Sequence, residues 1–149
     1  MIWIIKGFEE LLAAHIILAS FIPLVVYLSG AVSAQVQMFY VRDMAVYDKL
    51  PMIRYIFRHS VVVVSLGLMV AVVLFVVNSV VLDIGVSAPV VSIATLTAVL
   101  SAIITGIGVP FLLSRVLKDP ASATPPLAII SSDLLTVFFY FTTASFFLT

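Results

Sequence analysis

The sequence contains no cysteine and very few charged residues. Without cysteine the chain can form neither disulfides nor thiolate metal sites, although oxygen ligands remain available. Charged residues make up 9% of the 149 residues, compared with about 25% in a typical soluble domain. Seven basic and seven acidic residues give a formal net charge of +0. The absence of a long basic run argues against a nucleic-acid partner.

Apolar residues, in contrast, are abundant and occur in long runs. They make up 64% of the chain, and a helix needs about 20 apolar residues to cross a bilayer. The sequence therefore predicts an all-α integral membrane protein, with one transmembrane domain over residues 1–149 and no soluble regulatory domain. An N-terminal apolar stretch at residues 1–5 is too short to span, and is either the last turn of a further helix or part of an interfacial segment. The four complete spans of the helical bundle are expected at residues 11–41, 60–82, 90–113 and 126–148.

The basic residues predict the orientation of these spans. All but Lys6 fall in two loops, at residues 42–58 and 114–125. Basic residues are enriched in cytoplasmic loops. We therefore expect both loops in the cytoplasm, the C-terminus outside, and a multi-pass protein of the plasma membrane surrounded by lipid.

Small residues recur at helical spacing within the spans. Ala98, Ala102 and Gly106 follow one another at every fourth position, and Gly67 and Ala71 repeat this spacing in the preceding span. Such stripes allow helix backbones to approach closely. The sequence therefore predicts closely packed helices.

A single carboxylate, Asp133, lies deep in the last span. It follows Pro125 by eight residues, or about 12 Å of helix. An Asp at the centre of a membrane helix costs about 2.5 to 3.5 kcal/mol, and such residues usually mark ion or proton paths. Thr136, Tyr140 and Thr143 share its face, which predicts a polar stripe that faces protein or water. The alternative is a protonated Asp133 bonded to a neighbouring Ser or Thr.

One carboxylate is too little to enclose a divalent ion, but a two-fold dimer would present two on its axis. Mg²⁺ loses water reluctantly and is often held by one or two carboxylates through a largely intact hydration shell. The residues thus favour a cation path, with the cation itself left open. An intramembrane protease would need a second carboxylate or an activated nucleophile, so we do not expect an enzyme.

The order and spacing of several residues resemble the MgtE magnesium channel family. The C-terminal signature of that family is similar to Pro110, Arg115, Asp119-Pro120-Ala121, Ala123, Pro126 and Asp133. Upstream, its loop after the first helix is similar to Phe8-Glu9-Glu10, and its next helix to Pro23, Gly30, Gln35 and Arg42. The resemblance covers nearly the whole chain.

This resemblance implies a homodimer of five-helix membrane domains, with a pore on the dimer axis lined by the second and fifth helices of the family. Residues 1–7 would be the stub of the first helix. Asp133 matches the pore carboxylate that holds hydrated Mg²⁺, the transported ion, and the backbone carbonyl of Ile129 would assist it. No catalytic cofactor is implied. The pore-lining candidates are Gly30, Ala31, Ser33, Pro126 and Thr136.

Two positions depart from the family pattern. Ala31 stands where the family has an Asn, and His59 where it has a Glu. An altered ion preference, or a heterodimer in which a paralogous half supplies Asn and Glu, would explain both. The alternative function is a non-conducting structural or regulatory membrane subunit, in which Asp133 forms a buried hydrogen bond.

Overall fold

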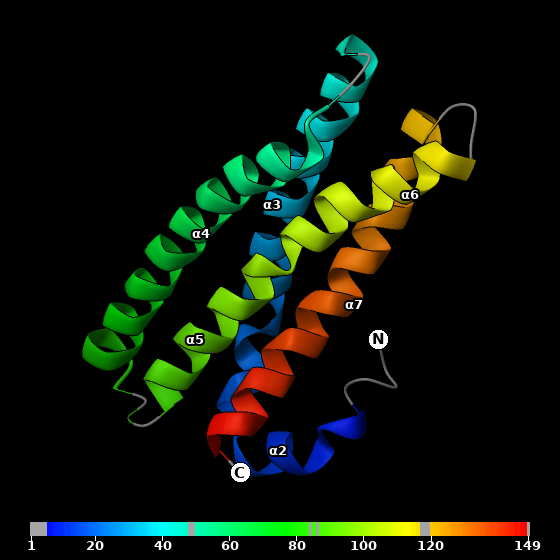
Figure 1. The fold of residues 1–149 in the computed structure, drawn as a ribbon. Helices are drawn as coiled ribbons and strands as arrows, with labels where there is room; N and C mark the ends of the chain where they lie inside the picture. The colour runs from blue at the N-terminus through cyan, green and yellow to red at the C-terminus, as the bar shows by residue number, and fades with distance from the viewer. Residues whose placement is uncertain (1–5, 48–49, 84, 86, 117–119, 149) are drawn as a thin grey trace.

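The computed structural model describes residues 6–47, 50–83, 85, 87–116 and 120–148. For residues 120–124 it describes the backbone only. Every element in these ranges is a helix, and four stretches are long and apolar enough to cross a membrane. Figure 1 shows them as long rods packed side by side, with the short helix α2 (Glu9–Ala14) near the end where the chain finishes. The expected all-α membrane bundle is confirmed.

Helix α3, Ile17–Val46, forms the first long rod. The expected span at 11–41 is divided at His15, whose backbone leaves the helical region (φ −133°, ψ 67°). Hydropathy could not reveal this break, because apolar residues also precede it. One of them, Leu11, is apolar because it packs in the core of the bundle and not because it faces lipid. At its other end α3 continues past residue 41 through Arg42 and Asp43, which form an ion pair of 2.8 Å.

The second rod begins earlier than the sequence predicts. Helix α4 runs over Met52–Val76 and continues as a π-helix, η1, over Val77–Val81. Arg54 and Arg58 therefore lie in the first turns of a helix and not in a loop. The positions of the charged residues did not mark the start of this helix, because a long Arg side chain can extend from a membrane helix toward the interface.

The third rod is the most buried of the four. It consists of α5 (Ser87–Leu100), the π-helix η2 (Ile104–Gly108) and α6 (Val109–Val116). Pro110 follows the π-helix and has no N–H to donate to the preceding turn. Figure 1 shows this rod crossing the middle of the bundle, in front of α3 and between α4 and α7.

Helix α7, Pro120–Leu148, is the last rod. It begins six residues before the expected span at 126–148 and continues through Pro125 and Pro126. Pro120 is its first residue, the position at which a missing N–H is harmless. Asp119, which precedes it, and residues 1–5 of the expected first-helix stub lie outside the described residues. Helix α7 packs on α3, α5, η2 and α6.

Close backbone contact joins α3 to the central rod. A Cβ atom added to Gly106 would lie 2.8 Å from Cβ of Val36 and 2.9 Å from the backbone oxygen of Ser33. Ala98 and Ala102, on the same stripe, are fully buried. The predicted small-residue packing is confirmed for this stripe.

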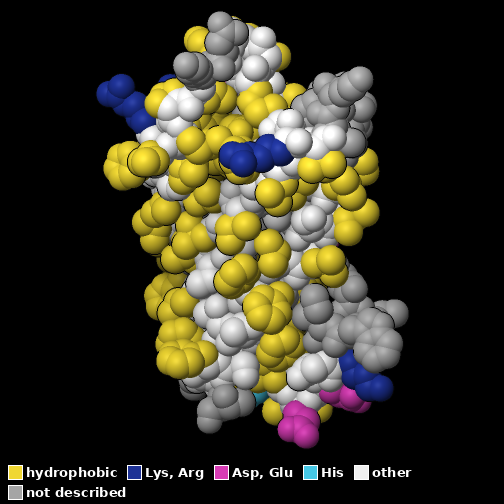
Figure 2. All heavy atoms as spheres, turned by 45° about the vertical axis from the view of Figure 1, so that its right-hand side comes forward, with side chains coloured by type: hydrophobic (Ala, Val, Ile, Leu, Met, Phe, Trp, Pro, Cys, Tyr) yellow, Lys and Arg dark blue, Asp and Glu magenta, His cyan; other side chains and the backbone are white. Residues whose placement is uncertain are grey.

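Charged side chains separate toward the two ends of the bundle. Figure 2 shows Lys and Arg side chains near its upper end, acidic and further basic side chains at its lower end, and many apolar side chains between. We use "basic end" for the end that carries Arg42, Arg54, Arg58 and Arg115. The opposite end carries Glu9, Glu10 and Asp83. This separation is expected of a bundle that crosses a membrane, because apolar surface faces lipid and charges lie near the interfaces.

Candidate functional site

The polar stripe on α7 is used largely for hydrogen bonds between helices. The Thr136 hydroxyl donates to Ser29 Oγ at 2.7 Å, and Ser29 Oγ donates to the backbone oxygen of Ala98 at 3.0 Å. These two bonds connect α7, α3 and α5. Two further residues of the stripe do the same: Tyr140 donates to the backbone oxygen of Leu18, and Thr143 shares a hydrogen bond with Thr97 on α5.

Asp133 differs from the rest of this stripe. Its side chain is partly exposed, and it forms no hydrogen bond or ion pair with any residue that the structure describes. The alternative of a protonated Asp133 bonded to a neighbouring Ser or Thr is therefore not seen. Of the other charged residues in the four spans, the deepest is Arg58, six residues from the start of its rod at Met52. Asp133 is thus the most deeply placed charge in the described spans.

The hydrogen bond between Thr136 and Ser29 fixes which part of α3 lies beside Asp133. The two helices are antiparallel (Figure 1), so Asp133, one turn nearer the basic end than Thr136, lies level with residues 30–33 of α3. A Cβ atom added to Gly30 would meet nothing within 4 Å, and Ala31 is exposed. The surface beside Asp133 is therefore formed by small residues of α3.

A groove continues this surface toward the basic end. It has a volume of about 430 Å³ and lies between α3 and α7. Ile129, one turn from Asp133 on the same face, is 52% exposed and lines it from α7. The other lining residues are Ala34, Gln37, Met38, Val41, Arg42 and Pro125. We call this groove, together with Gly30, Ala31 and Asp133, the α3–α7 surface.

The structure separates the predicted pore-lining residues into two groups. Ala31 and Pro126 are exposed and Gly30 is partly exposed, as a wall facing a second molecule requires. Ser33 and Thr136 are instead 2% and 0% exposed. Ser33 shares a 2.7 Å hydrogen bond with Thr105 of η2, and Thr136 is bonded to Ser29. Each of these two hydroxyls is therefore buried within one copy and hydrogen-bonded to another helix of the bundle.

Replacement of Thr136 by Val tests whether its hydroxyl serves helix packing or the pore wall. The nearly isosteric change removes the bond to Ser29 and is expected to lower stability by about 0.6 to 1.7 kcal/mol, the range found for hydrogen bonds between membrane helices. Cation transport should be largely retained, because the hydroxyl does not reach the surface and the close contact of Gly106 with α3 remains. Thermal unfolding in detergent and liposome uptake would be measured beside Thr142→Val, an exposed position on the same helix. Loss of uptake with unchanged stability would return Thr136 to the pore wall.

Ser29 joins three helices but could hardly be singled out from the sequence. Its spacing relative to the α7 stripe is visible only once α3 and α7 are paired. Gln37, two residues beyond Gln35 of the family pattern, is buried and lines the groove. Gln35 itself is exposed.

His59, which stands where the resembled family has an acid, is held by local contacts. Its ring stacks on Tyr55 with centroids 4.1 Å apart, and its Nδ1 lies 3.0 Å from the backbone oxygen of Tyr55. No three His, Asp or Glu side chains come together among the described residues. Within that part of the chain, one copy therefore offers an ion a single carboxylate on the α3–α7 surface.

The fold and this surface define a multi-pass membrane protein with an intramembrane carboxylate between two antiparallel helices. The class becomes specific by comparison with known families. The model of the MgtE divalent cation transporter family matches residues 22–143, most of the chain, and the chain belongs to this family. Its members transport divalent cations and are not enzymes. No curated protein matches the chain.

Proposed function

We propose that two copies of this chain form a pore for a hydrated divalent cation, most favourably Mg²⁺, on their common axis. Asp133 of each copy would hold the hydrated ion, and the Ile129 carbonyl would assist. The observation that carries the proposal is the Asp133 carboxylate, which lies at membrane depth and is partly exposed without a described partner. The family match supports transport of a divalent cation.

The chemistry of the ligand set supports Mg²⁺ over a more demanding ion. Ca²⁺ prefers six to eight oxygen ligands, far more than two carboxylates and two carbonyls provide directly. Mg²⁺ keeps several of its waters and needs few protein ligands. Two copies of Asp133 would also balance the charge of a dication.

The shape and composition of the α3–α7 surface support a second copy as its partner. The exposed face of α3 carries Tyr27, Ala31, Ala34 and Met38 at helical spacing, and Tyr27 and Met38 are 75% and 68% exposed. Small residues beside Asp133 leave room for a hydrated ion, while the larger ones provide contact area further along the helix. Ala31 in place of the family's Asn would give this wall a methyl group instead of an amide, so that selectivity would depend mainly on Asp133.

The charge distribution supports an orientation for this pore. The basic end is assigned to the cytoplasm of a cell with the protein in its plasma membrane, because cytoplasmic loops are enriched in Lys and Arg. The C-terminal end of α7 would then face outward. In this orientation Asp133 lies nearer the cytoplasmic mouth.

Cysteine cross-linking tests the proposed dimer face. The chain has no cysteine, so a single introduced thiol can be linked only to a second molecule. Ala31→Cys is expected to give a covalent dimer in membranes with a bifunctional thiol reagent, since two copies would meet near this residue. Val72→Cys, on the outer side of α4 and 61% exposed, should remain monomeric. Cross-linking of Val72→Cys but not of Ala31→Cys would place the interface elsewhere.

Uptake by liposomes tests the conducting function itself. The purified chain, reconstituted around a Mg²⁺-sensitive dye, is expected to admit Mg²⁺ down its gradient without another energy source. A cross-linked dimer that admits neither Mg²⁺ nor another divalent cation would favour the non-conducting subunit. Uptake only after a different chain is added would favour a heterodimer.

A further inference from the structure

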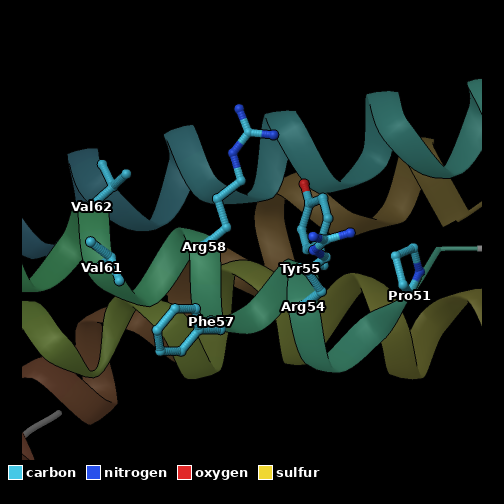
Figure 3. A pocket seen from close by; sticks show the side chains of 7 residues that line it. All are labelled: Pro51, Arg54, Tyr55, Phe57, Arg58, Val61 and Val62. Atoms are coloured by element: carbon cyan, nitrogen blue, oxygen red, sulfur yellow. The ribbon is translucent and has the colours of Figure 1, made fainter.

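A second groove lies on the outer side of α4 at the basic end, away from α7. Its volume is about 650 Å³. Figure 3 shows Arg54 and Arg58 beside it, with Phe57 and the valines of the next turn along the same helix. A further hollow adjoins it, sharing Pro51, Arg54 and Phe57. The result is a site with a positive end near the membrane interface and an apolar end deeper in the bilayer.

Among the described residues, the two arginines of this groove have no counterpart to the interactions that hold the other arginines of the basic end. Arg42 is paired with Asp43, and the Arg115 guanidinium lies 4.6 Å from the centre of the Phe111 ring. Arg54 and Arg58 are exposed and have no ion pair, hydrogen bond or ring contact with a described residue.

The positions of these two charges would be stabilised by a bound anion. They are four residues apart, so they share a face of the helix and repel one another. They also lie near the N-terminus of α4, the positive end of its dipole, and the first turn of α4 has no acidic residue. A phosphate between them would relieve both effects and could accept hydrogen bonds from the guanidinium groups.

We propose that this groove binds an anionic phospholipid. Arg54 and Arg58 hold its phosphate, and an acyl chain lies against Phe57, Val61 and Val62. The depth of the residues matches this occupant: the arginines lie two and six residues into the rod that begins at Met52, or about 3 and 9 Å, and the valines lie beyond them. Basic pockets beside membrane helices are typical binding sites for anionic headgroups.

The observations favour a lipid over the other occupants of such a groove. A soluble anion would satisfy the arginines but leave the apolar wall uncovered. A second copy of the chain would bring two positive surfaces together. The groove is also separate from the α3–α7 surface, because α4 and α7 lie on opposite sides of the central rod (Figure 1).

Lipid binding can be measured by native mass spectrometry of the purified chain in neutral detergent. Phosphatidylglycerol and phosphatidylcholine with the same acyl chains are compared. We expect preferential binding of phosphatidylglycerol, and a loss of about 30-fold in its affinity in the double variant Arg54→Gln/Arg58→Gln, from the typical contribution of two basic residues near a membrane surface. The double variant with Lys at both positions should retain most of the binding, because it keeps both charges.

Arg115→Gln is the matched control for the single variant Arg58→Gln, since it also removes one charge at the same end but does not line the groove. The affinity of this variant for phosphatidylglycerol should change by less than about 3-fold, because salt screens exposed charges that do not touch the lipid. If the double Gln variant fails to insert, Arg58→Gln alone should lose about 5-fold. Unchanged lipid affinity in the Gln variants would overturn the proposal. Equal binding of both lipids, displacement of the lipid by millimolar inorganic phosphate, or self-association through this groove would also overturn it.

Discussion

Replacement of Asp133 by Asn is expected to lower divalent cation uptake by about 100-fold. Two unit charges 4 Å apart attract one another by about 4 kcal/mol at an effective dielectric constant of about 20. A water-filled contact weakens this attraction, and a loss of about 2.7 kcal/mol at the ion site corresponds to the 100-fold change. Asn keeps the size of the side chain and removes only its charge. Initial rates of Mg²⁺ entry into liposomes would measure the effect.

Asp83→Asn is the matched control for this experiment. Asp83 is exposed between η1 and α5 and has a positive φ of 47°, a conformation that Asn tolerates well. Uptake should therefore be unchanged. Asp133→Asn should insert, and after Ala31→Cys is added it should still cross-link, because the carboxylate has no described hydrogen bond to lose. Full uptake by this variant would remove Asp133 from the ion path. Loss of both uptake and cross-linking would indicate a structural role.

The membrane fold could be predicted from composition because the bilayer limits what a chain can do. A run of apolar residues such as Ser60 to Leu82 can hardly be anything but a membrane helix at this length. The ends of the helices were less predictable, since Arg54 and Arg58 read as loop residues but lie in α4. The break at His15 depends on how α2 folds back onto the bundle, which local sequence does not encode.

The candidate site was predicted in part, for an identifiable reason. Asp133 stood out because a lone charge in an apolar helix is costly wherever the helix lies. Thr136 shares its stripe, but a hydroxyl in a membrane helix is as suited to a neighbouring helix as to an ion. In the structure Thr136 bonds to Ser29 of α3. Which residue lies opposite Thr136 depends on how the helices pack, which the sequence of α7 alone does not reveal. The same is true of Ser33 and Thr105.

The proposed ion site depends on how α3 is held inside each copy. Together with the close contact of Gly106, the bonds from Thr136 to Ser29 and between Ser33 and Thr105 hold α3 against α7 and η2. Gly30, between the two serines, thereby faces open space. A change in the position of α3 would move the wall beside Asp133. Close packing inside each copy is therefore a condition for the proposed pore between copies.

Gly106→Ala is expected to disturb this packing and to lower stability by about 2 kcal/mol. The added methyl group would lie within 3.0 Å of Cβ of Val36 and of the backbone oxygen of Ser33, so α3 itself must move. Overpacking of this kind costs about 1 to 3 kcal/mol, and we expect the upper value because one neighbour is backbone. Replacing Gly in a helix returns up to about 1 kcal/mol, which gives the net value. Thermal unfolding in detergent would measure it.

Gly108→Ala, in the same π-helix, is expected to change stability in the opposite direction. A Cβ atom at Gly108 would meet nothing within 4 Å, so only the gain in helix propensity remains and stability should rise by up to about 1 kcal/mol. The two variants add the same methyl group at positions two residues apart. A difference between their stabilities therefore reports the close contact at Gly106 and not a general effect of alanine on η2. Equal shifts in both melting temperatures would contradict the contact between Gly106 and α3. If α3 moves as expected, Gly106→Ala should also slow cation uptake, whereas Gly108→Ala should not.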